Sequence, residues 1–364
     1  MPAPVCVSIV TYNSRAVIGR CLESVLAQRG VSLEVVVVDN ASRDGTREAL
    51  AGFRPAVRVI ANPRNLGFAA AQNQAIALGF GRWVLTLNPD VLLEPDFVAQ
   101  LLEAGETDDR VGSVCGKLLA IGPGFVPLPQ RCLDSAGMYF TAALRHFDRG
   151  WHQPDDGRFD RLEYVFGASA AAALYRRAMI EDISLDDGFL DPDFFTYRED
   201  ADVAWRAQLL GWRCLYQPAA VAHHIRTMVP GRRASVPAVL NMHSVKNRFL
   251  MRIKNITGGV YRRCWLPATA RDLAVLGGCL VFEHSSLPAF WRLAAALPRA
   301  FRKRRQIMAR RRVSDEDLAR WFQRGPVAAP ARQVRFYQTD ARSAAGPNPR
   351  RPAGAHSNVV SPGT

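Results

Sequence analysis

The sequence predicts an α/β fold in which a mostly parallel sheet is covered by helices on both faces. Three observations predict it. Strand-like and helix-like segments alternate over roughly the first 110 residues, the strand-like segments are continuous apolar runs, and polar or acidic residues follow them. Strands interleaved with helices form parallel sheets. Strands buried on both faces are apolar throughout rather than alternating.

The individual elements follow from these patterns. Buried strands are expected at residues 5–13, 33–40, 57–62 and 83–90. The segments between them have apolar residues at helical spacing or a capping residue at a helix start, and they predict helices at 14–28, 42–53 and 67–80. Residues 111–164 have a looser pattern, 203–210 form an amphipathic helix, and 213–224 form a last strand.

The pattern changes near residue 235. Residues 236–322 contain helical segments with apolar faces and many arginines, and the remainder is rich in Pro, Gly, Ala and Ser. We therefore expect an α/β domain at 1–235, a helical, basic extension at 236–322, and a disordered tail at 323–364.

The chain of 364 residues has a net charge of +14, which suggests an anionic partner. Residues 299–312 contain eight basic side chains and no acidic one, and they follow the apolar stretches 274–282 and 290–298. Mixed apolar and basic segments favour contact with a membrane surface. No motif for reading nucleic acid is present, so we expect no nucleic-acid partner.

The cysteines and the apolar stretches indicate the cellular compartment that we expect for the protein. The seven cysteines are odd in number and lack metal-ligand spacing, which suggests reduced thiols in a cytoplasmic protein. The first residues lack the basic start and long apolar stretch of a signal peptide. No window reaches ~18 uninterrupted apolar residues, so we expect no membrane-spanning helix. The first strand–helix loop carries neither a dinucleotide-binding nor a P-loop motif.

Two strand ends carry oxygen ligands. Asp39 ends one buried strand, where a carboxylate can bind a nucleobase or ribose, and its alternative role is helix capping. Asn88 and Asp90 flank Pro89 after the strand at 83–87, where Mg²⁺ could take one or two protein oxygens. The alternative is a solvated loop. Asn65 and Gly67 precede a helix start that suits a phosphate or forms an ordinary turn.

Two further pairs of candidate site residues lie later in the chain. Glu199 and Asp200 follow an aromatic-rich loop and open a helix, so one of them is a candidate general base and both are candidate capping residues. His223 and His224 end the last strand, where an imidazole could complete a metal site with carboxylates or have only a structural role.

The order of these motifs is more specific than any one of them. "VSIVTYNS", "EVVVVDNASRDGT", "NPRNLGFAAAQNQAI", "VLTLNPDVLLEPDF", "FLDPDFFTYREDADVAWRAQLLGW" and "AAVAHH" together resemble the family 2 inverting glycosyltransferases, most closely rhamnosyltransferase-like members that build cell-surface polysaccharide. The resemblance covers roughly residues 4–250. It implies a GT-A fold, with a nucleotide-binding half and an acceptor-binding half around one sheet.

The resemblance also implies roles for matching positions. Asp200 matches the catalytic base, with Glu199 as the alternative. Asp90 and His223 match the metal ligands, with His224 as the alternative register, and the cofactor would be Mg²⁺ or Mn²⁺. Asn88 departs from the usual Asp-x-Asp motif, which weakens the expected metal site. The donor site would be formed by Thr11, Tyr12, Asn13, Asp39, Asn40, Asn65, Gly67, Phe68, Asn73 and Asn88.

The implied reaction is transfer of a sugar, with rhamnose favoured, from a dTDP- or UDP-sugar to a lipid-linked glycan acceptor. The enzyme would be cytoplasmic and peripheral at the inner face of the plasma membrane. Three alternatives remain. A nucleotidyltransferase would show a Gly-rich phosphate loop. A degenerate protein would bind a nucleotide sugar or glycan without catalysis. A nucleic-acid-binding protein would explain the charge alone.

Overall fold

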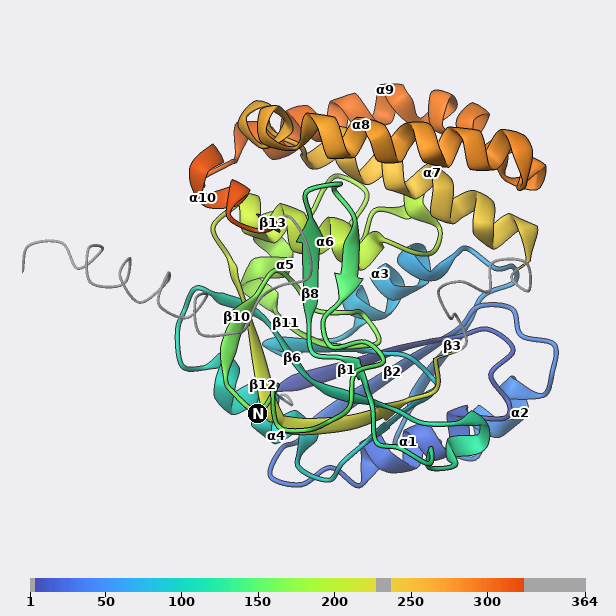
Figure 1. Cartoon of the computed structure of the whole chain (residues 1–364). Helices are drawn as coiled ribbons and strands as arrows, with labels where there is room; N and C mark the ends of the chain where they lie inside the picture. The colour runs from blue at the N-terminus through green and yellow to red at the C-terminus, as the bar shows by residue number, and fades with distance from the viewer. Residues whose placement is uncertain (1–3, 227–236, 324–364) are drawn as a thin grey trace, which may run out of the picture.

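The computed structural model describes residues 4–226 and 237–323. Within them, a mixed, mostly parallel sheet runs through the lower half of the molecule (Figure 1), with the strand order β10-β12-β6-β11-β4-β1-β2-β3. Strand β5 pairs with β12, and β7 pairs with β6. The strands are β1 (Val5–Thr11), β2 (Leu33–Asp39), β3 (Arg58–Ala61), β4 (Trp83–Leu87), β5 (Val91–Leu93), β6 (Val111–Ala120), β7 (Leu133–Ser135), β10 (Glu163–Val165), β11 (Ala172–Arg176) and β12 (Arg213–His224).

The strand directions bring five strand ends to one edge. Strand β1 is parallel to β2 and β4, whereas β11 is antiparallel to both β4 and β6. Strands β6 and β12 are parallel to each other, so they run in the direction of β4. The carboxyl ends of β1, β2, β4, β6 and β12 therefore meet at the same edge, the usual ligand-binding edge of such sheets.

Helices cover both faces of the sheet, as predicted. Along β1, Val7 and Ile9 pack in one cluster with α1 (Ile18–Leu26), α2 (Thr46–Ala51) and α4 (Phe97–Gly105). Cys6 and Val10 pack in another cluster with α3 (Phe68–Leu78). Successive side chains of a strand point to opposite faces. Because both faces are buried, the strand is apolar at nearly every position.

The second face also carries α5 (Arg177–Ile183) and α6 (Glu199–Leu209), beneath a layer of C-terminal helices. These are α7 (Ala238–Asn255), α8 (Gly258–Val281), α9 (Pro288–Ala309) and α10 (Asp315–Ala319), and α8 and α9 form the outermost layer in Figure 1. Strands β8 (Met138–Thr141), β9 (His146–Asp148) and β13 (Phe322–Gln323) form a small second sheet. Short 3-10 turns lie at Pro123–Phe125 (η1), Pro192–Phe194 (η2) and His284–Ser286 (η4).

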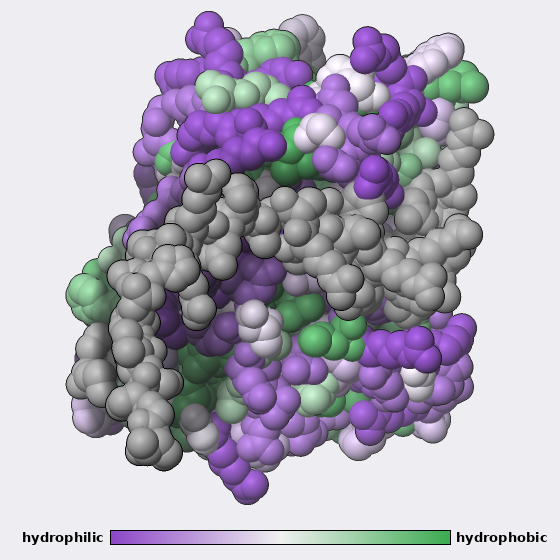
Figure 2. Space-filling model, turned by 90° about the vertical axis from the view of Figure 1, so that its left-hand side faces the viewer, coloured by the Kyte–Doolittle hydropathy of each residue, from purple (hydrophilic) through white to green (hydrophobic). Residues whose placement is uncertain are grey.

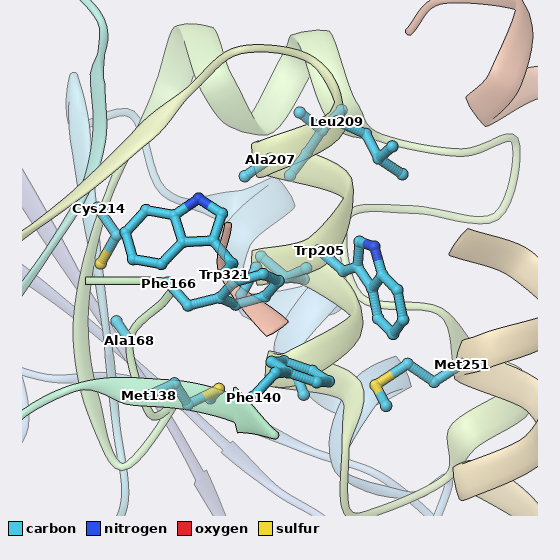
Figure 3. Packing of buried hydrophobic residues seen from close by; sticks show 14 of the residues in the cluster. Met138, Phe140, Phe166, Ala168, Trp205, Ala207, Leu209, Cys214, Met251 and Trp321 are labelled. Carbon is cyan, nitrogen blue, oxygen red and sulfur yellow. The ribbon is translucent and has the colours of Figure 1, made fainter. Parts of the chain in front are cut away.

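One hydrophobic cluster crosses the expected domain boundary at 235/236. Trp205 of α6 packs against Phe140 and Phe322, with ring centroids 5.1 and 5.0 Å apart, and Met251 of α7 belongs to the same cluster (Figure 3). The C-terminal helices therefore share their core with the α/β part. The division at 235/236 stays a prediction, and the tail from residue 324 lies outside the described residues.

Helix α8 requires one correction to the sequence prediction. It is long and apolar enough, by length and composition, to cross a membrane. The criterion of an uninterrupted apolar run missed it because Arg271 and Asp272 interrupt the segment. Here α8 lies in the helical layer, where Asp272 pairs with Arg252 of α7 at 2.6 Å. The seven cysteines are free thiols, as expected.

Candidate active site

A cavity of about 620 Å³ opens at the carboxyl edge of the sheet. Its walls come from the loop after β4, the β8–β9 hairpin, the start of α6, the end of β12, and helices α7 and α8. The side chains that line the cavity include Phe68, Asn88, Asp90, Arg145, His146, Asp148, Tyr197, Arg198, Glu199, Asp200, His224, Arg226, Arg248 and Arg271. Segments more than 180 residues apart in sequence therefore meet in one cavity.

Asp90 lies beside His224 in this cavity. The Nε2 atom of His224 is 3.4 Å from Asp90 Oδ1, and that buried oxygen has no hydrogen-bond partner among the described residues. The other ring nitrogen, Nδ1, is 2.8 Å from Asp134 Oδ2. Burial lowers the pKa of His224, but the hydrogen bond to Asp134 and the negative charges of Asp134 and Asp90 outweigh burial and raise it to about 9.

In the predicted histidine pair, this arrangement favours the alternative register, His224, over His223 as the residue that faces Asp90. His223 points away from the cavity, and its Nε2 lies 2.8 Å from Glu94 Oε1 at the surface. Neighbouring side chains on a strand point to opposite faces, so only one of the two histidines can face Asp90. The donor set fits a divalent cation. It consists of the unpartnered oxygen of Asp90 and the Nε2 atom of His224, and Asp134 supports the imidazole from behind.

Glu199 and Asp200, at the start of α6, form the second acidic group. Asp200 accepts backbone hydrogen bonds from Ala201, at 2.7 Å, and from Ala170, at 3.3 Å. Burial and the charge of Asp148 raise the pKa of Asp200 to about 6. Burial and the charge of Asp200 raise the pKa of Glu199 to about 8. A carboxylate with a raised pKa is a stronger base, as a general base near neutral pH requires.

The backbone before these acids is strained. Phe195, Tyr197 and Arg198 have φ values of 66°, 68° and 72°, which side-chain-bearing residues rarely adopt. Gly67 lies directly against this segment, because a Cβ atom at Gly67 would stand 2.5 Å from the Phe195 ring. The start of α3 and the acidic loop thus hold each other in place. Strained backbone of this kind is found at functional sites, where surrounding contacts impose it.

The predicted nucleotide-side residues gather where β1 and β2 end. Thr11 donates a hydrogen bond to Asp39, which also accepts from Arg47 Nε at 2.6 Å. Asn40 donates to the Asn65 side chain at 2.8 Å and to the carbonyl of Gly67. Asp39 and Asn40 are buried and fixed by these contacts.

The remaining predicted residues have different surroundings. Tyr12 is 53% exposed, and Asn13 accepts a hydrogen bond from the backbone of Arg43. The Asn73 amide binds Leu190 through both backbone groups, at 2.7 and 2.9 Å, which fixes the loop after α5. Phe68 and Asn88 line the cavity together with Asp90, Glu199, Asp200 and His224.

No sequence pattern pointed to several residues that line the cavity or, in the case of Asp134, lie directly behind it. These are Asp134, Arg145, His146, Asp148, Arg198, Arg226, Arg248 and Arg271. Half of them come from the stretch with the looser pattern, and the others are arginines in a chain with many basic residues. Arg226 binds both Asp134 and Asp148, which ties the end of β12 to the β8–β9 hairpin.

A second acidic group, Asp187, Asp191 and Asp193, has the spacing of a metal site. Lysines already neutralise it. Lys303 contacts all three carboxylates, and Lys254 binds Asp191 at 2.5 Å. None of the three acids lines the cavity. We therefore treat this group as part of the packing between η2 and the C-terminal helices.

Comparisons with known proteins identify the family and the fold. The family model "Glycosyl transferase family 2" matches residues 6–184. The chain is 31% identical over 241 residues to the N-acetylglucosaminyl-diphospho-decaprenol L-rhamnosyltransferase of Mycobacterium tuberculosis, covering 61% of this chain and 76% of that protein. It is 41% identical over 99 residues to the succinoglycan biosynthesis protein ExoO of Rhizobium meliloti, covering 27% of this chain but only 28% of ExoO.

Two solved structures share the fold. The crystal structure of GalNAc-T7 with UDP, GalNAc and Mn²⁺ aligns with a TM-score of 0.54 at 15% identity, covering 70% of this chain and 49% of that one. The crystal structure of S. aureus TarS aligns with a TM-score of 0.51 at 16% identity, covering 88% and 54%. The fold is the predicted GT-A fold with a C-terminal helical region. The chain belongs to glycosyl transferase family 2 and is a rhamnosyltransferase-like glycosyltransferase.

Proposed function

We propose that this enzyme is an inverting glycosyltransferase of cell-surface glycan synthesis. It transfers a sugar, with rhamnose favoured, from a dTDP- or UDP-sugar to a hydroxyl of a lipid-linked acceptor. One observation carries the proposal: the Asp90–His224 pair and the partly buried base candidate Asp200 line the same cavity. The named activity of the mycobacterial relative supports the choice of rhamnose and of a diphosphate-linked acceptor.

The proposed mechanism is a single displacement. Asp200 takes the proton of the acceptor hydroxyl while that oxygen forms a bond to the anomeric carbon of the donor sugar. The bond from this carbon to the donor diphosphate breaks, and the diphosphate leaves with the electron pair. Attack occurs on the face opposite the leaving group, so the configuration inverts. One carboxylate is enough, whereas a double displacement would also need a nucleophile.

Asp90 and His224 would hold the divalent cation, Mg²⁺ or Mn²⁺. Such an ion neutralises the negative charge that develops on a leaving diphosphate. Asp134 orients the His224 ring from behind, and a carboxylate in this position raises the basicity of a metal-binding imidazole. Asp39, Asn40 and Asn65 would bind the nucleoside at the ends of β1 and β2.

The proposal is tested with a donor panel. Binding and hydrolysis of dTDP-, UDP- and GDP-sugars are measured with Mn²⁺, with Mg²⁺ and with EDTA. We expect cation-dependent binding and slow hydrolysis of one nucleotide class, with dTDP-rhamnose as the first choice. Hydrolysis of none, together with tight binding of a nucleotide sugar or glycan, would favour the non-catalytic binding protein.

The two histidines are expected to differ as metal ligands. His224→Gln should weaken Mn²⁺ binding in the presence of nucleoside diphosphate by at least about tenfold, and Asp134→Asn by about 10–100-fold. His223→Gln is the matched control, because it removes an imidazole from the adjacent position outside the cavity. Calorimetric titration of Mn²⁺ measures all three. Equal losses in the two histidine variants would contradict the assignment.

We also propose that the enzyme associates with the inner face of the plasma membrane through α8 and α9. Their outer surface carries large exposed apolar side chains, namely Trp265, Leu266, Leu273, Leu280, Val281, Phe282 and Trp291. The face of the helical layer turned toward the viewer in Figure 2 is mainly hydrophilic, with smaller apolar patches. Exposed apolar groups beside basic ones suit a bilayer interface.

The basic run 299–312 contributes less to this surface than its sequence suggests. Lys303 is buried, Arg299 pairs with Asp193, and Arg312 pairs with Asp182. Arg304 and Arg310 donate to backbone carbonyls, and Arg311 pairs with Asp315. Most of the run therefore binds the protein itself, and the apolar side chains of α8 become the better targets for a test.

Replacing Trp265, Leu273 and Leu280 together with serine should abolish co-sedimentation with vesicles that contain anionic lipid. Each side chain is more than half exposed, and none of them belongs to a buried hydrophobic cluster, so the fold should be retained. Burying one such side chain is worth roughly 1.5–3 kcal/mol, so three should change affinity by far more than tenfold. Phe80→Ser, which removes a side chain exposed by 73% beside the α/β sheet, is the control. Unchanged sedimentation of the triple variant would exclude this surface.

A further inference from the structure

The cavity contains a second charged region, distinct from the Asp90–His224 pair. Five arginines line it: Arg145, Arg198, Arg226, Arg248 and Arg271. They come from the β8–β9 turn, the residue before α6, the segment after β12, α7 and α8. Arg226 is neutralised by Asp134 and Asp148. The other four lie where the α/β part and the helical layer meet.

Arg248 is the most deeply buried of these arginines, and it forms no ion pair with a described acid. The residue is 94% buried (relative exposure 6%), and its Nη1 atom has no hydrogen-bond partner among the described residues. The Nε atom of Arg271 is also buried and unpartnered. Burial and the charges of Arg198, Arg271 and Arg145 lower the pKa of Arg248, and the acid that opposes them, Asp272, is paired with Arg252. A guanidinium stays protonated at neutral pH, so Arg248 is a buried positive charge that no described carboxylate neutralises directly.

His146 lies among these arginines. Burial and the charges of Arg198, Arg248, Arg145 and Arg226 hold the pKa of His146 well below its usual range. The ring is therefore neutral, and its Nδ1 accepts a hydrogen bond from Arg198 Nη1 at 3.1 Å. Among the acids of the cavity, Asp148 binds Arg226, and burial and the charge of Asp200 raise the pKa of Glu199 to about 8, so that Glu199 is protonated at neutral pH. An anion bound here would meet several donors and no competing carboxylate at Arg248.

We propose that Arg248 and Arg271, flanked by Arg145 and Arg198, bind the diphosphate of a lipid-linked acceptor. The inference deepens the proposed function and rests on it. Guanidinium groups match phosphate oxygens in geometry and charge. A donor diphosphate, the other source of this group, would bind at Asp90 and His224. In a single displacement the acceptor approaches from the face opposite the leaving group, so its own diphosphate needs a separate site on the Asp200 side.

The placement of α8 agrees with such an acceptor. Arg271 lines the cavity, and Leu273, two residues later, is 63% exposed on the outer surface proposed to meet the membrane. One helix therefore borders both the anion-binding region and the apolar surface. A phosphate tethered to a membrane-embedded chain could enter the cavity beside α8 while its lipid stays in the bilayer.

The first test is binding of inorganic pyrophosphate and of geranyl diphosphate, measured by calorimetry in EDTA. Arg248→Gln and Arg271→Gln should each weaken binding by at least about tenfold, as expected for loss of a charge-assisted contact. Arg263→Gln is the charge-matched control, because Arg263 lies on the exposed side of α8. Asp90→Asn should leave both affinities unchanged. Geraniol, which lacks the diphosphate, should not compete.

A second arm distinguishes the two sources of diphosphate. Affinity for dTDP and UDP in Mn²⁺ should change by less than twofold in Arg248→Gln, while KM for a diphosphate-linked sugar acceptor rises at least tenfold. Equal weakening of nucleotide and prenyl diphosphate would assign the arginines to the donor and overturn the proposal, as would unchanged binding of both. If wild-type enzyme binds prenyl diphosphate through Arg248 but transfers no sugar, the proposed function fails separately. If Arg248→Gln does not fold, the same measurements on Arg271→Gln test the proposal, because Arg271 is less buried than Arg248.

Discussion

Asp200→Asn is expected to reduce sugar transfer by about 10²–10⁴-fold, the usual contribution of a general base. Asparagine has nearly the same shape and can still accept the backbone hydrogen bonds of Ala170 and Ala201. It cannot take a proton from the acceptor hydroxyl. Steady-state transfer assays should therefore show a fall in kcat, while donor affinity, measured by calorimetry, stays close to wild type. A variant with undiminished kcat would remove Asp200 from the mechanism.

The pH profile provides an independent check on Asp200. Its pKa is raised to about 6, and only the ionised carboxylate can act as the base. The rate should therefore be highest above pH 6 and should fall about tenfold per pH unit below it. Glu199→Gln is the matched control, because burial and Asp200 raise the pKa of Glu199 to about 8, which keeps it protonated at pH 7. If Glu199→Gln loses activity and Asp200→Asn does not, the base is Glu199.

Lys254→Met is expected to destabilise the fold by about 3–5 kcal/mol, the cost of breaking a buried ion pair by removing one partner. Lys254 and both of its partners, Asp191 and Asp202, have fully buried side chains. Asp202 also binds Arg206, whereas Asp191 would retain Lys303 as its one ion-pair partner among the described residues. Methionine fills a similar volume, so the loss should come from uncompensated charge. Urea unfolding measures the change in the free energy of unfolding.

Arg299→Gln is the control for this prediction. Arg299 binds Asp193 of the same acidic group, but its side chain is 50% exposed. Solvent-exposed ion pairs are worth about 0–1 kcal/mol, so the free energy of unfolding should change by less than 1 kcal/mol. Similar losses in both variants would mean that burial does not set the strength of these contacts. A large loss in Lys254→Met alone would show that α7 is held to the α6 region by buried charge as well as by apolar packing.

Local patterns in the sequence predicted the first strands and helices well because each one is short and internally consistent. The continuous β-branched run Val35–Val38 is typical of a buried strand, and the observed β2 ends at Asp39 as expected. Strand β6 was missed. It contains two glycines and the buried Lys117, which is neutralised by Asp155 and Asp160. Its strand character depends on pairing with β11 and β12, which lie far along the chain, and no local pattern contains that information.

The histidine pair shows the same limit at the site. The sequence places His223 and His224 at a strand end, but the face to which each one points depends on how β12 pairs with β5 and β6. That pairing places His224 beside Asp90 and Asp134, and His223 beside Glu94. A change of one residue in register exchanges the two faces of a strand. The choice between the histidines therefore required the assembled sheet.

The sequence by itself determined the fold class, the order of the motifs, and the strand ends where the acids Asp39 and Asp90 lie. These properties follow from hydrophobic periodicity and from residue types within short segments. Only the tertiary structure decided which histidine faces the cavity, which basic residues are neutralised, and where Arg248 meets Arg271. Those outcomes depend on distances between segments far apart in the chain, because burial and charge act through space rather than along the sequence.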